Sequence, residues 1–225
     1  SLREEFARKL YEKRKRKGMT YDDATEMMMN RDYFGAMMVE TGMADAFLSG
    51  FSRNYPNSIR PALHCIGVDE NCKRIAGMYV IMTKRGPLFL ADTTVNVQPD
   101  ARALVDIAKM TAREIRHFGI EPVMAFASFG NLGSYRGPGE HAHVWEAVGI
   151  LHREMPELVV DGEMQANIIF DENLRNEKYP FTRLGNRQVN AIIFPDLNSG
   201  NILYKTLQSL SGYEAIGPIL MGMKK

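Results

Sequence analysis

The chain has 225 residues, of which 45% are hydrophobic and 24% charged, and its net charge is +1. This composition is typical of one large globular domain or two small ones, and a net charge so close to zero gives no global field that would recruit nucleic acid or a membrane surface. No apolar run is long enough to span a membrane, and residues 1–18 are too charged for a signal peptide. Cys65 and Cys72 are expected as free thiols of a cytoplasmic protein.

Three helices are predicted in the first 42 residues. The first covers residues 3–17, with apolar residues at fourfold spacing on one face. The second runs over residues 20–29 and begins at a capping-box pattern formed by Thr20 and Asp23. The third covers residues 32–41. The N-terminal part of the chain is therefore expected to be helical.

A loop with two arginines follows these helices. Residues 44–50 predict a short buried strand, and the next stretch, GFSRNYPNSIRPAL (residues 50–63), leads into a helix with Ser58 as its expected N-cap. The unpaired N–H groups of a helix start and the positive pole of its dipole attract anions, and an arginine adds bidentate hydrogen bonds to them. The loop therefore predicts an anion site at Arg53 and Arg60. Two solvated arginines on a surface turn are the open alternative.

From about residue 68–74 onward, strands alternate with helices. Two strands joined by the turn KRG predict a hairpin, and the segments after it alternate in type to the end of the chain. Nearly continuous apolar strands in such an alternation predict an α/β layered fold with a mostly parallel sheet. The expected elements are strands 74–83 and 87–97, helix 99–117, strand 122–128, helix 140–155, strand 158–160, a short helix near 171, strand 189–195, helix 200–210 and strand 217–220.

Small, acidic and amide residues gather where the predicted strands end. They are Ser49-Gly50 with the arginine loop, Asp92-Thr93-Thr94, the stretch SFGNLGS (128–134), the stretch DGE (161–163) and the stretch PDLNSGN (195–201). Ligands of open parallel sheets bind outside the carboxyl ends of the strands, so this pattern predicts a ligand site at that edge. For each stretch taken alone, a turn or a helix cap is the favoured alternative. The spacing of the His and Cys residues predicts no metal site, and no nucleotide-binding glycine motif or nucleophile-elbow motif occurs.

Seven segments, taken in chain order, together resemble the phosphate acetyl/butyryltransferase family. Within that family, RNYPNSIRPAL and GMYVIMTKRGPLFLADTTVN are most similar to the C-terminal phosphotransacetylase-like domain of bacterial multidomain malic enzymes. The seven segments are KLYEKRKRKGMTYDDATEMMMNRDYFGAMMVETGMADAFLSG, NSIRPAL, PLFLADTTVNVQPDA, NLGS, VVDGEMQAN, FPDLNSGNILYKTLQ and EAIGPILMGMKK.

The resemblance implies a three-layer αβα fold with a mostly parallel sheet and two subdomains that enclose a cleft. The first subdomain would be only partly present, as residues 1–68 with 217–225, and residues 69–216 would form the second. The family's first strands would precede Ser1. The elements that complete the first subdomain, with the Ser-Arg pair and aspartate that activate the CoA thiol, would follow Lys225. The chain is therefore expected to be a fragment without catalytic residues.

Two departures from the transferase pattern favour a regulatory function. The His-Thr-Thr-type segment before the family's arginine is replaced by RNYPNS, and the polar loop between two strands is reduced to TKRG. The resulting interpretation is a regulatory, acetyl-CoA-sensing and dimerising domain of an NADP-dependent malic enzyme, which converts malate to pyruvate. NADP and a divalent metal are expected on a missing N-terminal half, and no cofactor on this chain. The alternatives are a catalytic phosphate acetyltransferase, which exchanges acetyl between phosphate and CoA, and an assembly module with an empty cleft.

The resemblance also implies ligand and partner contacts. Arg60 would hold the phosphate or acyl phosphate, and Arg14 would lie near the CoA side. The expected partners are acetyl-CoA or a related acyl-CoA and a second copy of the chain in a homodimer or higher oligomer, built mainly from residues after Arg74, with helix 200–210 as a candidate contact. The other expected cleft residues are Asn131, Gly133, Ser134, Asn198, Ser199 and Asn201.

Overall fold

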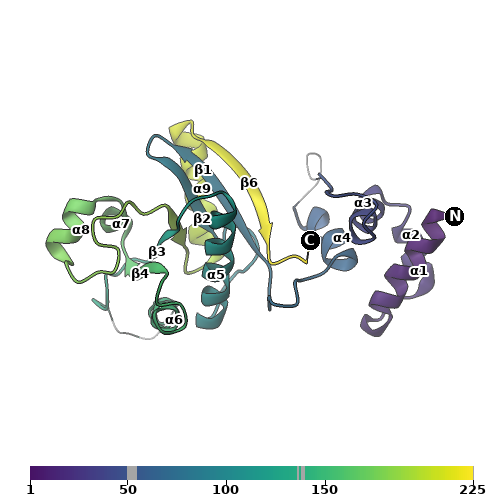
Figure 1. The fold of residues 1–225 in the computed structure, drawn as a ribbon, viewed down its shortest axis with the longest axis horizontal. Coiled ribbons are helices and arrows are strands. Elements are labelled where there is room, and N and C mark those ends of the chain that lie inside the picture. Colours follow the sequence, from purple (N-terminus) through teal and green to yellow (C-terminus); the bar gives the residue numbers. More distant parts are fainter. Residues whose placement is uncertain (50–54, 136, 138–139, 225) are drawn as a thin grey trace. The chain divides into compact units, whose positions relative to one another are not determined.

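The structure is a computed structural model that describes residues 1–49, 55–135, 137 and 140–224 (Figure 1). The chain divides into two compact units. The first unit is Ser1–Lys73 with Met223–Lys225, and the second unit is Arg74–Gly222. The sequence-based boundary had assigned residues 217–225 to the first unit. The structure keeps residues up to Gly222 in the second unit, because the last strand pairs with the sheet there.

The described part of the first unit is helical. The predicted capping box is confirmed, because the Thr20 side chain accepts from the Asp23 backbone N–H and the Asp23 carboxylate accepts from the Thr20 N–H. Phe6, Leu10 and Met37 are among the side chains that pack into one apolar core. The elements are α1 (Leu2–Arg14), the short 3-10 helix η1 (Lys15–Lys17), α2 (Tyr21–Met27), α3 (Arg31–Glu40) and α4 (Tyr55–Cys65).

Two local predictions in this unit are wrong. Residues 44–49 form no strand. Instead, the Phe47 ring lies directly on Gly35 of α3, where an added Cβ would collide with it. Ser58 is not an N-cap, because α4 begins at Tyr55 and Ser58 lies within its first turn. Arg53, the other arginine of the predicted anion loop, lies outside the described residues.

The second unit is built on one six-stranded sheet with the order β4-β3-β5-β2-β1-β6. Four neighbouring strands, β4, β3, β5 and β2, run parallel, whereas β1 is antiparallel to both β2 and β6. The predicted hairpin is confirmed, and so is the mostly parallel sheet. The strands are β1 (Ala76–Thr83), β2 (Gly86–Ala91), β3 (Val123–Ala127), β4 (Val159–Met164), β5 (Ala191–Ile193) and β6 (Glu214–Met221).

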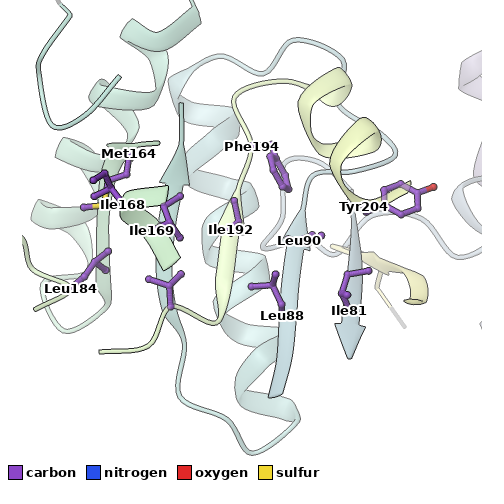
Figure 2. Close-up of a cluster of buried hydrophobic side chains, with 12 residues drawn as sticks. Ile81, Leu88, Leu90, Met164, Ile168, Ile169, Leu184, Ile192, Phe194 and Tyr204 are labelled. Carbon is purple, nitrogen blue, oxygen red and sulfur yellow. The ribbon is translucent and has the colours of Figure 1, made fainter. Parts of the chain in front are cut away.

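Helices cover both faces of this sheet, which gives three layers. On one face, Leu90 and Ile192 pack with Ile168 of α7 (Ala166–Phe170) and Tyr204 of α9 (Leu197–Ser211) (Figure 2). Phe89 points the other way, because successive side chains of a strand alternate, and its ring packs against Phe118, the residue that follows α5 (Ala101–His117). The remaining helices are α5 (Ala101–His117) and α6 (Glu140–Glu154), which pack against each other, and α8 (Glu172–Lys178), which follows α7.

The stretch 161–163 is part of a strand and not the predicted loop, because β4 extends through it and pairs with β3. Gly162 has φ 151°, and an added Cβ would lie 2.8 Å from the Phe126 carbonyl oxygen. Only a glycine fits such a backbone next to β3. The sequence reading missed this because Asp-Gly is also a common turn signal.

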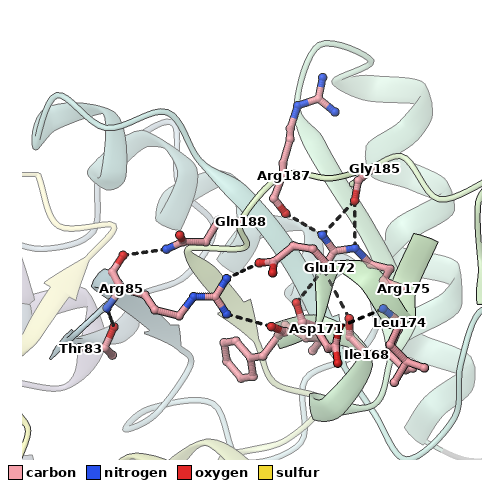
Figure 3. A network of polar contacts seen from close by, with 12 residues as sticks. Thr83, Arg85, Ile168, Asp171, Glu172, Leu174, Arg175, Gly185, Arg187 and Gln188 are labelled. Carbon is pink, nitrogen blue, oxygen red and sulfur yellow. Dashed lines mark hydrogen bonds and ion pairs between the residues drawn. The ribbon is translucent and has the colours of Figure 1, made fainter. Parts of the chain in front are cut away.

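A buried arginine ties the segment after α8 to α7. Arg175 is 0% exposed, and its guanidinium donates to the carbonyl oxygens of Ile169 (2.7 Å), Gly185 (2.9 Å) and Arg187 (2.6 Å) (Figure 3). No carboxylate is needed, because several carbonyl acceptors surround the cation. Arg175 therefore fixes the loop over residues 183–188 against the helices that follow β4.

Candidate functional site

The connections of the second unit bring two predicted stretches to one end of the sheet. β3 and β5 are neighbours, but the chain after β3 leads to α6 and the chain after β5 leads to α9 on the opposite face. Open α/β sheets bind ligands at such a reversal, outside the carboxyl ends of the strands. The topology therefore places residues 128–134 and residues 195–201 at adjacent strand ends, as the sequence predicted.

The loop after β3 is held by groups from β4. The Glu163 carboxylate, which is 1% exposed, accepts from the Gly133 N–H at 3.0 Å. Asn131 Oδ1 accepts from the Gln165 N–H at 2.9 Å, and Ser134 Oγ accepts from the Asn131 N–H at 2.9 Å. The predicted ligand side chains Asn131 and Ser134 therefore also shape their own loop. Glu163 is a positioning residue that the sequence reading placed in a loop.

Polar groups at the start of α9 also form hydrogen bonds with their neighbours in the chain. Asp196 caps the helix by accepting from the Ser199 N–H at 2.9 Å, and Ser199 Oγ donates to the Asp196 carbonyl at 2.9 Å. Asn201 Nδ2 donates to the Thr93 carbonyl at 3.1 Å, while Asn198 is exposed. Of the three residues predicted here, Asn198 is the one whose side chain faces solvent and makes no bond to a described residue.

Close packing fixes this helix start against the end of β2. An added Cβ at Gly200 would lie 2.5 Å from the Asp92 carbonyl oxygen, so only glycine allows the approach. The Asp92 carboxylate is 3% exposed and accepts from the backbone N–H groups of Thr94 (2.8 Å) and Asn96 (2.8 Å). Asp92 therefore has a structural role, and its carboxylate builds the turn beneath α9.

The first unit gathers three cationic side chains around a histidine, and we call these four residues, Arg14, Lys17, Arg60 and His64, the basic cluster. Burial lowers the pKa of His64, and the positive charges of Arg14, Arg60 and Lys17 lower it further. Tyr33 Oη lies 2.9 Å from His64 Nδ1. The structure therefore brings the two predicted arginines, from α1 and α4, to one histidine.

Two buried polar atoms, one in α1 and one in α4, have no hydrogen-bond partner among the described residues. They are Arg14 Nε and Ser58 Oγ. A buried donor without a partner costs about 1–3 kcal/mol, which the oxygen of a bound anion would recover. Arg60 is an exposed residue, so its guanidinium is available to a ligand from solvent. The basic cluster therefore has the donors and charge of an anion site.

The sequence reading found Arg14 and Arg60 but missed His64. The sequence spacing could have indicated His64, because it follows Arg60 by four positions and residues four apart on a helix lie on the same face. The wrong helix start also hid the fact that Ser58 lies within α4, with its hydroxyl buried.

The described residues contain no group of three or more His, Cys, Asp and Glu side chains able to hold a metal ion. Among the helices in the described part of the chain, none is both long and apolar enough to span a membrane.

Comparison with known proteins gives consistent matches over the whole chain. The family model for phosphate acetyl/butaryl transferase matches residues 1–225. The phosphate acetyltransferase of Bacillus subtilis is 34% identical over 98% of this chain, and that of Corynebacterium glutamicum is 36% identical over 99%. A crystal structure of a phosphotransacetylase from Streptococcus pyogenes has a TM-score of 0.88 at 36% identity over 99% of this chain. The chain spans 67%, 67% and 66% of these three proteins, respectively.

Proposed function

Because the chain belongs to the phosphate acetyl/butaryl transferase family, we propose that it forms part of an enzyme that transfers an acyl group between CoA and phosphate. The observation that best supports this proposal is the basic cluster, in which Arg14 and Arg60 both lie close enough to His64 to lower its pKa. In addition, Arg14 Nε and Ser58 Oγ are buried without a hydrogen-bond partner among the described residues. The names of the relatives, all phosphate acetyltransferases, support the same reaction class.

A transfer reaction between CoA and phosphate needs cationic groups at the phosphate-binding site. In the reaction, a phosphate oxygen attacks the thioester carbon of acyl-CoA, the C–S bond breaks, and CoA thiolate and acyl phosphate result. Arg60 and Arg14 would bind the phosphate oxygens by charge-assisted hydrogen bonds and offset the negative charge of phosphate beside the developing thiolate. We assign no catalytic residue in this chain, because both arginines act here by binding and orienting.

The strand ends of the second unit are our candidate acyl-CoA contact. Since Asn131, Ser134, Ser199 and Asn201 already bond within the protein, we expect contacts there through backbone groups and through the exposed amide of Asn198. Homodimer formation and a cytoplasmic location are parts of the same proposal.

The malic-enzyme interpretation is wrong. The relatives that match nearly the entire chain at 34–36% identity are phosphate acetyltransferases, and these matches support no oxidoreductase, NADP or malate assignment. The departures RNYPNS and TKRG were too local to outweigh similarity along the whole chain. The expectation of NADP and a metal on another half had depended on that interpretation.

A direct assay tests the proposal. The full-length protein is incubated with acetyl phosphate and CoA, and formation of the thioester is followed by its absorbance. We expect turnover that falls strongly in Arg60→Ala and persists in Arg16→Ala, which removes an exposed arginine of η1 outside the basic cluster. A folded full-length protein without turnover would exclude the function.

A further inference from the structure

A pocket lies in the second unit beside β4, which is an edge strand of the sheet. Its volume is about 640 Å³, within the range of small-molecule sites. One wall is α6, and the other comes from the segment over residues 181–183, with Asp161 and Gly162 of β4 between them in the lining. Leu132, from the loop after β3, completes the lining, so the pocket adjoins the predicted contacts at the strand ends but shares no residue with the basic cluster.

The α6 wall is one face of that helix. Trp145, Val148, Gly149, His152 and Arg153 follow one another at spacings of three, one, three and one, which places them on one side. Gly149 leaves open space, because an added Cβ would have a single neighbour, an Arg153 nitrogen at 3.6 Å. A larger side chain at this helical position would therefore fill the pocket without forcing the backbone.

Two large aromatic side chains of the lining are exposed. Trp145 is 61% exposed and Phe181 is 71% exposed. The Phe181 ring is held edge-on by Tyr179, with ring centroids 6.2 Å apart. Exposed aromatic rings on both walls of a pocket offer flat surfaces on which a planar ligand ring can stack.

Some charged groups of the pocket are hydrogen-bonded within the protein, and others are available to a ligand. The Asp161 carboxylate is used within the protein, because it accepts from Thr182 Oγ1 at 2.7 Å and from the Arg183 N–H at 2.8 Å. By contrast, Arg153 and Arg183 are exposed residues of the lining, and neither forms an ion pair with a carboxylate of a described residue. His152 Nε2 is also engaged, 2.9 Å from the Val160 carbonyl. The pocket lining therefore offers two cations, Arg153 and Arg183, to a ligand. Of its two carboxylates, Asp161 is engaged within the protein, and Glu146 is the other.

We propose that this pocket binds a purine nucleotide. Its ring would stack on Trp145 and Phe181, and its phosphate oxygens would accept hydrogen bonds from Arg153 and Arg183. Guanidinium groups match phosphate geometry through paired N–H donors, and every purine has a face on which an aromatic ring can stack.

Trp145 makes the proposal directly measurable, because it is the single tryptophan of the chain. Titration of the protein with ADP should give a saturable change in tryptophan fluorescence. Adenosine alone and inorganic phosphate alone should each bind more weakly than ADP, since each supplies half of the contacts. A change that never saturates, or an equal response to phosphate alone, would overturn the nucleotide assignment.

Matched variants assign the signal to the pocket. Arg153→Ala with Arg183→Ala should weaken ADP binding about tenfold or more, since charge-assisted bonds are lost. Gly149→Met should abolish binding, whereas the control Gly149→Ala should retain most of it, and circular dichroism reports whether each variant is folded. The Arg14→Ala and Arg60→Ala variants should leave the response unchanged, which separates this site from the basic cluster. Wild-type affinity in folded Gly149→Met would refute the proposal.

Discussion

Tyr33 and His64 are joined across the first unit: the Tyr33 hydroxyl lies 2.9 Å from His64 Nδ1, linking α3 to α4. Burial and three nearby cations lower the pKa of His64 below its usual value of 6.5, so the ring is neutral at pH 7. The unfolded chain binds this proton at higher pH than the folded chain does. The contribution of His64 to the free energy of unfolding is therefore fully present above about pH 6.5, and it is lost as the pH falls through the lowered pKa.

The first prediction concerns this pH dependence. His64→Gln should make the free energy of unfolding fall less steeply between pH 7 and pH 5 than in the wild type, because one proton uptake on unfolding is removed. The control is His143→Gln, which changes an exposed histidine on α6 and should keep the wild-type slope. Urea unfolding at several pH values gives the comparison, and identical slopes for wild type and His64→Gln would contradict it.

The second prediction concerns the two thiols. Burial raises the pKa of Cys65 to about 12, and its Sγ lies within the helical core of the first unit. Since the thiolate is the reactive form, Cys65 should resist thiol reagents in the native protein, and the less buried Cys72 should react first. Ellman's reagent should count one fast thiol, none in Cys72→Ser, and two after denaturation. A fast thiol in Cys72→Ser would show the prediction to be incorrect.

The third prediction concerns the buried Arg175. Arg175→Met removes all donors to the carbonyl groups of Ile169, Gly185 and Arg187, so it should destabilise the protein by about 3 kcal/mol or more. Arg85 lies in the same network, but its ion pair with Glu172 is partly exposed (Figure 3). Arg85→Ala should cost about 1 kcal/mol or less. Urea denaturation measures the free energy of unfolding of both variants. A similar decrease for Arg175→Met and Arg85→Ala would contradict the prediction that the buried Arg175 contributes more.

The fourth prediction concerns the proposed phosphate site. Arg60→Ala should weaken binding of acetyl phosphate to the full-length protein by about 1.5–3 kcal/mol, since a charge-assisted hydrogen bond is lost. Arg60→Lys should recover part of the affinity, because it restores charge without the paired donors. Isothermal titration gives the constants, with Arg16→Ala as the control. Unchanged affinity in Arg60→Ala would remove this arginine from the site.

The fifth prediction concerns self-association. Ile202 and Leu210 of α9 are 64% and 83% exposed, and Ile216 on the edge strand β6 is 47% exposed. Apolar side chains gathered on one surface often mark a contact between copies, and a two-fold dimer is the commonest closed oligomer. Light scattering should show a dimer, and Ile202→Glu with Leu210→Glu should yield monomer. The control Trp145→Glu, on α6, should stay dimeric, while a wild-type monomer at micromolar concentration would refute the prediction.

Some features of this chain depend on residues that are close in sequence, and these the sequence predicted well. The capping box of Thr20 and Asp23 is made within one helical turn, and the hairpin of β1 and β2 closes around residues 84–85. The mostly parallel sheet also followed, because alternating strands and helices with buried strands leave few other packings. The family likeness was visible as well, since it extends along the whole sequence.

Other features required the tertiary structure, because they depend on contacts between residues far apart in sequence. Phe47 packs on Gly35, so residues 44–49 need no strand partner, and β3 holds Gly162 in an extended strand where Asp-Gly alone suggests a turn. The use of Asn131 was equally hidden, since its side-chain oxygen accepts from the backbone N–H of Gln165, 34 positions later in the chain. The pocket on α6 could not be read from its helix spacing, because its opposite wall comes from residues about 30 positions later in the chain, and only folding brings Trp145 and Phe181 to one cavity.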